Sequence, residues 1–314
     1  MKLPELKIGT RTAKIPIVQG GMAIRLSTAR LAAAVANEGG IGLIASSGMS
    51  EDELRYEIRL ARSLTDGVIG INNMVAASNF KEAVHVAMDE GIDLVVAGAG
   101  FSRDMFGWGR ETGTPIVPIV SSVKLAKISE RLGATAIVVE GKEAGGHLGT
   151  THSIKELIPD IRAAVSLPVI AAGGVLTGQD VADLFNMGAN GVQMGSRFAA
   201  SLESNASPML KEFYLKSRPE DVCVIHSPVG LPGRAVHNPF VDLSEAGKMP
   251  PKTCDKCLKN CRHNYCIIRA LIRAEQGDVE TGLVFTGENI HRIKKILSVK
   301  EIFAKIRDEV EKAS

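Results

Sequence analysis

The sequence predicts an α/β fold, a closed (β/α)8 TIM barrel with a C-terminal helical cap. Short apolar runs alternate with longer amphipathic segments eight times within about the first 200 of the 314 residues. The runs are continuously apolar, as parallel strands covered on both faces should be. Glycine and polar residues end several runs, at the place where barrels carry their active sites. An open, doubly wound sheet is the alternative fold.

The eight apolar runs are the expected strands. They span residues 15–20, 41–46, 68–74, 93–98, 115–120, 136–140, 168–174 and 191–195. Helical patterns follow at residues 27–37, from residue 50 onward, and at 79–90, 123–132, 154–165 and 179–187, with a broken pattern at 101–113. Ser50 is the expected N-cap of the second helix, because Glu53 follows three residues later.

The pattern changes after residue 200, and we therefore predict two parts. Residues 1–200 form the barrel, and residues 201–314 form a cap that packs on it. The cap segment begins with a helical pattern at 208–217 and continues through a loop rich in glycine and proline at 229–235. Further helical patterns occupy residues 266–276, 289–296 and 300–312.

Composition excludes several classes of protein. The net charge is +2 with no basic stripe, so we expect no nucleic-acid partner. No run of 18 apolar residues occurs and the N-terminal residues lack a signal-peptide core, so we expect neither a membrane span nor secretion. Five cysteines, four of them between residues 254 and 266, suit a cytoplasmic chain better than a disulfide scaffold.

Two glycine loops predict a phosphate site. They are Ala171-Ala-Gly-Gly174 and Gln193-Met-Gly-Ser196, which follow the seventh and eighth strands, where barrels often bind phosphate. The alternative is that these glycines only end strands. The first strand carries no G-x-G-x-x-G, so a cofactor with one phosphate, such as FMN, fits better than a dinucleotide. The amides of Gln19, Asn72 and Gln193 could then hydrogen-bond the flavin ring.

His147 is the candidate catalytic residue. It follows the sixth strand and stands among glycines at 145, 146 and 149, which allow sharp bends and close approach of a ligand. A histidine on a loop at the mouth of a barrel is well placed for acid–base chemistry. The alternative is a tight turn with an incidental histidine. His152 is a candidate for a supporting role.

Several motifs together resemble the nitronate monooxygenase superfamily. They are Gln19-Gly-Gly-Met-Ala23, Gly70-Ile-Asn72, Glu143-Ala-Gly-Gly-His-Leu-Gly149, Ala171-Ala-Gly-Gly174, Val192-Gln-Met-Gly-Ser-Arg-Phe198 and Glu203-Ser-Asn-Ala206. The resemblance runs over residues 10–240 and is greatest to the branch of FMN-dependent enoyl-acyl-carrier-protein reductases II, the FabK type. Leu148 follows the histidine as in these reductases, where the best-known nitronate monooxygenases tend to have Arg. The segment after residue 240 departs from the reductase pattern.

The resemblance implies a cofactor, a reaction and a set of site residues. FMN would be held by Gly21, Met22, Asn72, Gly173, Gly174, Gln193, Gly195 and Ser196. His147 would be the catalytic histidine. NADH or NADPH would reduce the flavin, which would then reduce a trans-2-enoyl thioester on acyl carrier protein, by a ping-pong mechanism in fatty-acid synthesis. The alternative is oxidation of alkyl nitronates by dioxygen, and a homodimer is the expected assembly.

Four cysteines have the spacing C-x2-C-x3-C-x4-C, at Cys254, Cys257, Cys261 and Cys266. Such thiols can bind zinc or an iron–sulfur cluster, and the first two could form a redox pair. The later spacings match no trusted signature, so free thiols packed in the cap are an equal alternative. We therefore assign no metal to the active site and expect the cysteines to take no part in the flavin chemistry.

Overall fold

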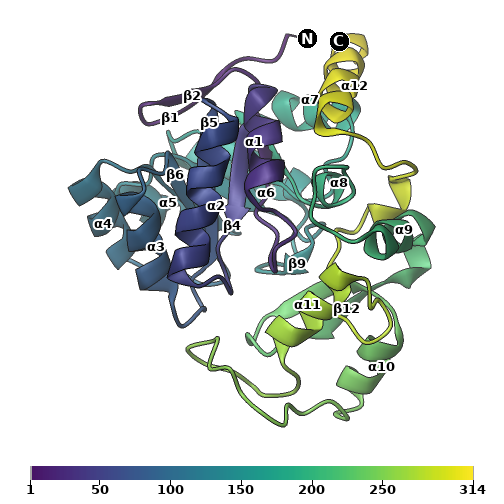
Figure 1. Ribbon diagram of the computed structural model, residues 1–314. Helices are drawn as coiled ribbons and strands as arrows, with labels where there is room; N and C mark the ends of the chain where they lie inside the picture. Colours follow the sequence, from purple (N-terminus) through teal and green to yellow (C-terminus); the bar gives the residue numbers. More distant parts are fainter. Residues whose placement is uncertain (1, 314) are drawn as a thin grey trace.

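Eight parallel strands close into a barrel, which confirms the predicted fold (Figure 1). The computed structural model describes residues 2–313. The strands are β3 (Ile17–Gln19), β4 (Ile41–Ala45), β5 (Val68–Met74), β6 (Leu94–Gly98), β7 (Ile116–Val120), β8 (Ile137–Glu140), β10 (Val169–Ala172) and β11 (Gly191–Met194). Their order round the barrel follows the sequence, and β11 pairs with β3 to close it.

The helices of the outer layer begin and end close to the predicted positions. They are α1 (Ala29–Asn37), α2 (Glu51–Leu64), α3 (Phe80–Asp89), α4 (Asp104–Thr112), α5 (Val123–Leu132), α6 (Ile154–Ala164) and α7 (Gly178–Asn186). Ser50 caps α2 as predicted, accepting the Glu53 N–H at 3.2 Å. The carboxylate of Glu53 binds Arg25 at 2.6 Å instead of completing a capping box.

Alternation along the strands separates two apolar layers. In β8, Ile137 and Val139 belong to the outer cluster shared with the helices, whereas Val138 belongs to the inner one. The hairpin of β1 (Leu6–Ile8) and β2 (Arg11–Ala13) adds its apolar side chains to this inner cluster. Since barrel interiors are packed with side chains, the hairpin closes the amino end, and ligands have access only from the carboxyl ends of the strands.

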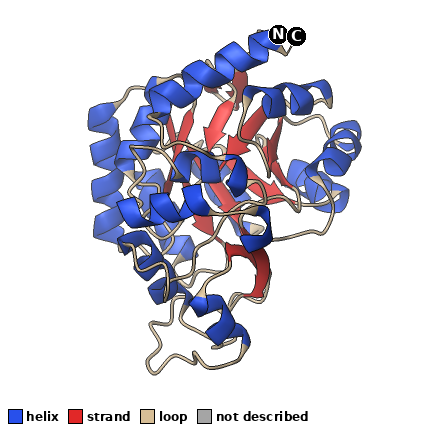
Figure 2. Cartoon of the chain, turned by 90° about the vertical axis from the view of Figure 1, so that its right-hand side faces the viewer, coloured by secondary structure: helices blue, strands red, loops and turns tan. Residues whose placement is uncertain are grey.

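The cap covers the carboxyl ends of the barrel strands and lies far from both termini (Figures 1 and 2). It contains a short antiparallel sheet in which β13 (Pro232–Val236) pairs with both β12 (Val222–His226) and β9 (Gly146–His147). Because β9 belongs to the loop after β8, the barrel contributes a strand to the cap. The helices of the cap are α8 (Ser196–Ala199), α9 (Pro208–Lys216), α10 (Pro239–Glu245) and α11 (Ile267–Gln276), with 3-10 turns η1 (Pro219–Asp221) and η2 (Ile290–Arg292).

The C-terminal helix α12 (Val299–Lys312) lies with the barrel, although we placed it in the cap segment 201–314. It packs against α7 and α1 and so completes the outer ring (Figure 1). Its apolar face, which includes Ile302, Phe303 and Ile306, is buried in the outer core. The cap is therefore an insertion between β11 and α12. Within residues 2–313, none of the helices has both the length and the apolar character needed to cross a membrane.

Candidate functional site

A cavity of about 250 Å³ lies between the carboxyl ends of the barrel strands and the cap. All nine residues proposed for the site line it: Gly21, Met22, Asn72, His147, Gly173, Gly174, Gln193, Gly195 and Ser196. They come from the ends of four barrel strands and from β9. The structure therefore brings together residues that are up to 175 positions apart in the chain, from Gly21 to Ser196.

The loop after β10 is shaped for close approach of a ligand to the backbone. Gly173 and Gly174 have φ angles of 117° and 73°, which side-chain-bearing residues rarely adopt. A Cβ on Gly174 would lie 2.9 Å from Asn289 Nδ2. At Gly195 an added Cβ would meet nothing nearer than the Met22 sulfur at 3.9 Å, so this glycine leaves room in the cavity.

Two amide side chains present unpaired acceptors to the cavity. Asn72 Oδ1 and Gln193 Oε1 are buried and have no hydrogen-bond partner among the described residues. A buried polar atom without a partner costs about 1–3 kcal/mol, so these oxygens are suited to a ligand that donates hydrogen bonds. The Asn72 Nδ2 donates to the Gly21 carbonyl at 3.3 Å, which fixes the side chain beside the first loop.

Gln19 does not take the role we expected for it. Its amide donates to the Gly20 carbonyl at 2.5 Å and accepts the Leu43 N–H at 3.0 Å, and it does not line the cavity. The neighbouring Val18 belongs to the inner layer of the barrel. Successive side chains on a strand point to opposite faces, so Gln19 points away from the interior and braces β3 against β4.

His147 lies deep in the site, held by groups from the cap. Its Nε2 is 2.8 Å from Ser227 Oγ, and its ring meets Phe285 edge-on with centroids 5.2 Å apart. Pairing with Gly233 in the cap sheet fixes its backbone. Burial lowers the pKa of His147 to about 4, so the imidazole is neutral at pH 7. Sequence analysis missed Ser227, because a serine eighty residues away carries no local signal of this contact.

The cavity is electrically neutral at pH 7. Of the described residues that line it, only Glu140, His147 and Tyr214 are ionisable, and none is Lys, Arg or Asp. Burial raises the pKa of Glu140 to about 8 and raises the pKa of Tyr214 as well. The Tyr214 hydroxyl donates to the Phe285 carbonyl at 3.0 Å. All three groups are therefore uncharged, and an anionic ligand would meet only N–H and O–H donors.

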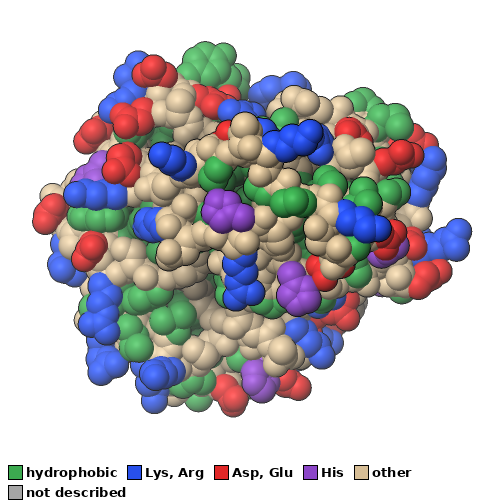
Figure 3. All heavy atoms as spheres, turned by 90° about the horizontal axis from the view of Figure 1, so that it is seen from below, with side chains coloured by type: hydrophobic (Ala, Val, Ile, Leu, Met, Phe, Trp, Pro, Cys, Tyr) green, Lys and Arg blue, Asp and Glu red, His purple; other side chains and the backbone are tan. Residues whose placement is uncertain are grey.

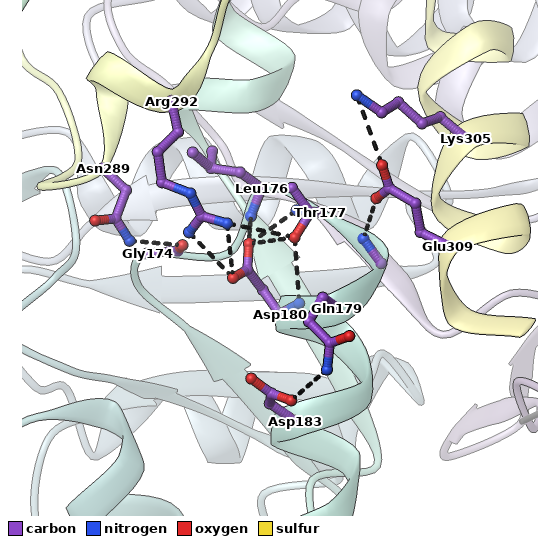
Figure 4. A network of polar contacts seen from close by, with 11 residues as sticks. Gly174, Leu176, Thr177, Gln179, Asp180, Asp183, Asn289, Arg292, Lys305 and Glu309 are labelled. Atoms are coloured by element: carbon purple, nitrogen blue, oxygen red, sulfur yellow. Dashed lines mark hydrogen bonds and ion pairs between the residues drawn. The ribbon is translucent and has the colours of Figure 1, made fainter. Parts of the chain in front are cut away.

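The segment 285–290 of the cap completes the wall beside the two glycine loops. The Gly287 N–H donates to Ser196 Oγ at 2.9 Å. Asn289 Nδ2 donates to the Gly174 carbonyl at 3.0 Å (Figure 4). Arg292 then binds Asp180 of α7 at 3.1 Å, which fixes the segment on the barrel. The polar run Thr-Gly-Glu-Asn at 286–289 was the available sequence signal, and we did not use it.

The cysteines lie outside the cavity. The segment that carries them pairs with the loop after β5, since Ser78 N–H donates to the Cys257 carbonyl at 3.0 Å. Burial, and then the nearby thiols, raise the pKa of Cys257 to about 11, so it stays protonated at pH 7. Throughout the described chain the thiols are free, and no three His, Cys, Asp or Glu side chains are arranged to hold a metal ion. His152 also lies outside the cavity, and its Nδ1 is 3.5 Å from Oε2 of Glu156.

The model of the nitronate monooxygenase family matches residues 5–90 and 75–309. A curated relative from Rhodococcus jostii, (3aS,4S,5R,7aS)-5-hydroxy-7a-methyl-1-oxo-octahydro-1H-indene-4-carboxyl-CoA dehydrogenase, is 32% identical over 235 residues, 74% of this chain. The match spans only 66% of that relative's length. A "probable nitronate monooxygenase" of Staphylococcus aureus is 30% identical over 274 residues, covering 72% of this chain and 76% of the relative.

Solved structures agree with these sequence matches. FabK from Thermotoga maritima superposes with a TM-score of 0.86 at 34% identity, over 95% of this chain and 93% of that one. Nitroalkane oxidase from Streptomyces ansochromogenes has a TM-score of 0.81 at 23% identity, over 95% and 96%, which shows a shared fold. Since the family model covers nearly the whole chain and the matches extend through the cap, this protein belongs to the nitronate monooxygenase family of oxidoreductases.

Proposed function

We propose that the protein is an FMN-dependent reductase of trans-2-enoyl thioesters that uses NADH or NADPH. The observation that carries the proposal is the neutral cavity, which suits an uncharged enoyl thioester. The similarity to FabK over 95% of the chain supports the same reaction. The acyl group would be carried as a thioester of acyl carrier protein or coenzyme A.

The cavity fits FMN in three respects. Gly173 and Gly174 bring backbone N–H groups to the surface, and Gly195 leaves space where another residue would add a Cβ. Ser196 adds a hydroxyl at the same loops. Among residues 2–313 no cation lines the cavity, so these donors would hold the phosphate, as backbone amides do at other phosphate sites. One of the unpaired oxygens of Asn72 and Gln193 would accept the single N–H of the oxidised ring.

The bound flavin would take a hydride from the nicotinamide and deliver it to the β-carbon of the enoyl group. The work of the protein is to orient the thioester and to handle the proton. His147 is neutral at pH 7, so one ring nitrogen carries a hydrogen that can bond the thioester carbonyl oxygen. Ser227, at 2.8 Å from Nε2, fixes the ring orientation. Protonation at the α-carbon then completes the reduction, with His147 or a water molecule as donor.

Oxidation of alkyl nitronates is the second candidate function. The matching family model and the Staphylococcus aureus relative carry this name. A nitronate is an anion, and within the described chain no lysine or arginine lines the cavity to attract it. Charge complementarity therefore favours the thioester.

Two assays on the same FMN-loaded preparation decide between the candidates. We expect NAD(P)H oxidation that depends on crotonyl-CoA, and little oxygen consumption with propane-2-nitronate. Oxygen consumption with the nitronate and no reduction of the thioester would overturn the proposal. A colourless protein that binds no added FMN would overturn both candidates.

A further inference from the structure

We propose that Glu140 binds the cofactor as an uncharged acid, donating its proton in a hydrogen bond, so that FMN is released when Glu140 ionises. The inference rests on the proposed flavin function but adds a residue and a pH dependence that the resemblance did not assign. Three observations carry it: the direction of the Glu140 side chain, its lack of a partner among the described residues, and the absence of Lys and Arg from the described cavity lining.

Strand alternation places Glu140 on the floor of the cavity. Ile137 and Val139 face the helices, and Val138 faces the barrel interior. Glu140 is two residues after Val138, so it faces the interior as well. Its strand neighbour in the register is Ala172, directly before the Gly173–Gly174 turn. The carboxyl therefore stands at the top of the interior, below the two glycine loops.

The same alternation places two amides beside it. Ile71 of β5 and Val192 of β11 belong to the outer cluster, so Asn72 and Gln193 face inward. The floor then holds two unpaired amide oxygens and one carboxyl group. A protonated carboxyl adds a donor to these two acceptors. The pyrimidine edge of an oxidised flavin carries one N–H between two C=O groups. One of the amide oxygens would accept that N–H, and the protonated carboxyl of Glu140 would donate to one of the carbonyls.

Within the described chain, Glu140 has no hydrogen-bond or ion-pair partner for its side chain. The charged residues nearest to Glu140 in the sequence do not line the cavity, and the ionisable groups that face it are neutral. Lys142 and Glu143 do not line the cavity, and the Glu143 carboxylate accepts from Ser153 Oγ at 2.6 Å and from Ile154 N–H at 3.0 Å. The facing ionisable groups, His147 and Tyr214, are uncharged at pH 7.

The energetic consequence follows from burial. Glu140 is partly exposed to the open cavity, and a ligand seated there would exclude the water around it. An ionised carboxylate would then have neither water nor a cation to stabilise it, so the neutral form is favoured. Burial raises the pKa of Glu140 to about 8. A ligand carbonyl that accepts a hydrogen bond from protonated Glu140 favours the neutral form further. Ionisation of Glu140 would place a negative charge against the same carbonyl oxygen. Loss of the proton therefore weakens binding.

The test measures the dissociation constant of FMN for the apoprotein by flavin fluorescence, from pH 6.5 to pH 9.5. If only the protonated form binds, the constant rises about tenfold between pH 7 and pH 9. The FMN phosphate is fully ionised over most of this range, since its second pKa is about 6. In Glu140→Gln a neutral donor persists at every pH, so the constant should stay near the parental pH 7 value throughout.

Glu111→Gln is the matched control, because this exposed carboxylate on α4 lies outside the cavity. It should show the parental pH dependence. A second measurement needs no variant: the infrared spectrum at pH 7 should contain the band of a protonated carboxyl group, and the band should be lost above pH 9. A parental dissociation constant that changes less than twofold from pH 7 to pH 9 would overturn the proposal, as would an equal alkaline loss in Glu140→Gln. Neither result depends on which substrate the enzyme reduces, so the two proposals fail separately.

Discussion

Replacing His147 with alanine should separate the two halves of the proposed reaction. Hydride transfer to the flavin needs no proton from this residue, so reduction by NAD(P)H should change less than threefold. Reduction of the enoyl thioester should slow by roughly 100-fold, the usual scale for a lost acid or carbonyl-polarising group. That factor corresponds to about 2.7 kcal/mol of transition-state stabilisation.

The structure also predicts how His147→Ala should change the free energy of unfolding. Truncation removes the Nε2 group that lies 2.8 Å from the buried Ser227 hydroxyl, and leaves that hydroxyl only the Val229 N–H at 3.3 Å, from which its oxygen accepts. An unsatisfied buried group costs about 1–3 kcal/mol, which urea unfolding of the apoprotein at pH 7 would detect. Ser227→Ala is the companion variant: it retains the imidazole but releases its orientation, and should slow thioester reduction about fivefold, the value of one neutral hydrogen bond.

Stopped-flow absorbance of the flavin measures both half-reactions in one instrument. The parental protein supplies the reference rates, and retained FMN absorbance shows that the variant is loaded. Thioester reduction at the parental rate in His147→Ala would refute the catalytic assignment. An equal loss in both half-reactions would instead show that the histidine shapes the cavity without taking part in the proton step.

Three further predictions follow from other parts of the site. Gly174→Asp should lose FMN on gel filtration, because the new side chain would meet Asn289 and place a carboxylate beside the phosphate; Gly91→Asp is its control, with a φ of 70° and open space around it, and should retain the flavin. Cys254→Ser combined with Cys257→Ser should leave flavin reduction by NAD(P)H unchanged, and loss of reduction in the folded, loaded variant would contradict the placement of these thiols outside the cavity. Glu140→Gln should stabilise the apoprotein at pH 7 but not at pH 4.5. The pKa of Glu140 is raised to about 8 in the folded state, so the unfolded chain releases this proton first and the native state loses stability as pH rises from 4.5 to 8. The variant lacks this proton and should be more stable than the parent by roughly 1–3 kcal/mol at pH 7. An equal change in the free energy of unfolding at both pH values, measured in urea, would refute the assignment.

The barrel could be predicted because its signals are local. Each strand is a continuous apolar run, and each run is followed by a helical pattern with caps such as Ser50. The loops at Gly174 and Gly195 could be found in the same way, since strand ends of a barrel converge on one face whatever the details of packing.

The partners of these loops could not be predicted, because they depend on contacts far along the chain. Ser227 and Asn289 reach the site only through the cap. Nothing in the neighbourhood of Ser227 indicates this, and the polar run at 286–289 indicates a loop at Asn289 without showing what it contacts. Gln19 was different: the alternation that turns Asn72 and Gln193 inward also turns Gln19 outward. That signal was present in the sequence. The expectation for Gln19 was wrong because it considered only that the residue has an amide side chain, and not whether its position on the strand faces the barrel interior.

The position of α12 has a consequence for synthesis of the protein on the ribosome. The helix that covers α1 and α7 is made only after the whole cap, residues 195–298, has been translated. Until then the apolar surface that receives Phe303 and Ile306 stays open on an otherwise nearly complete barrel. Nascent chains released before residue 299 would display this surface to solvent or to chaperones, and their fate would depend on how quickly they are captured.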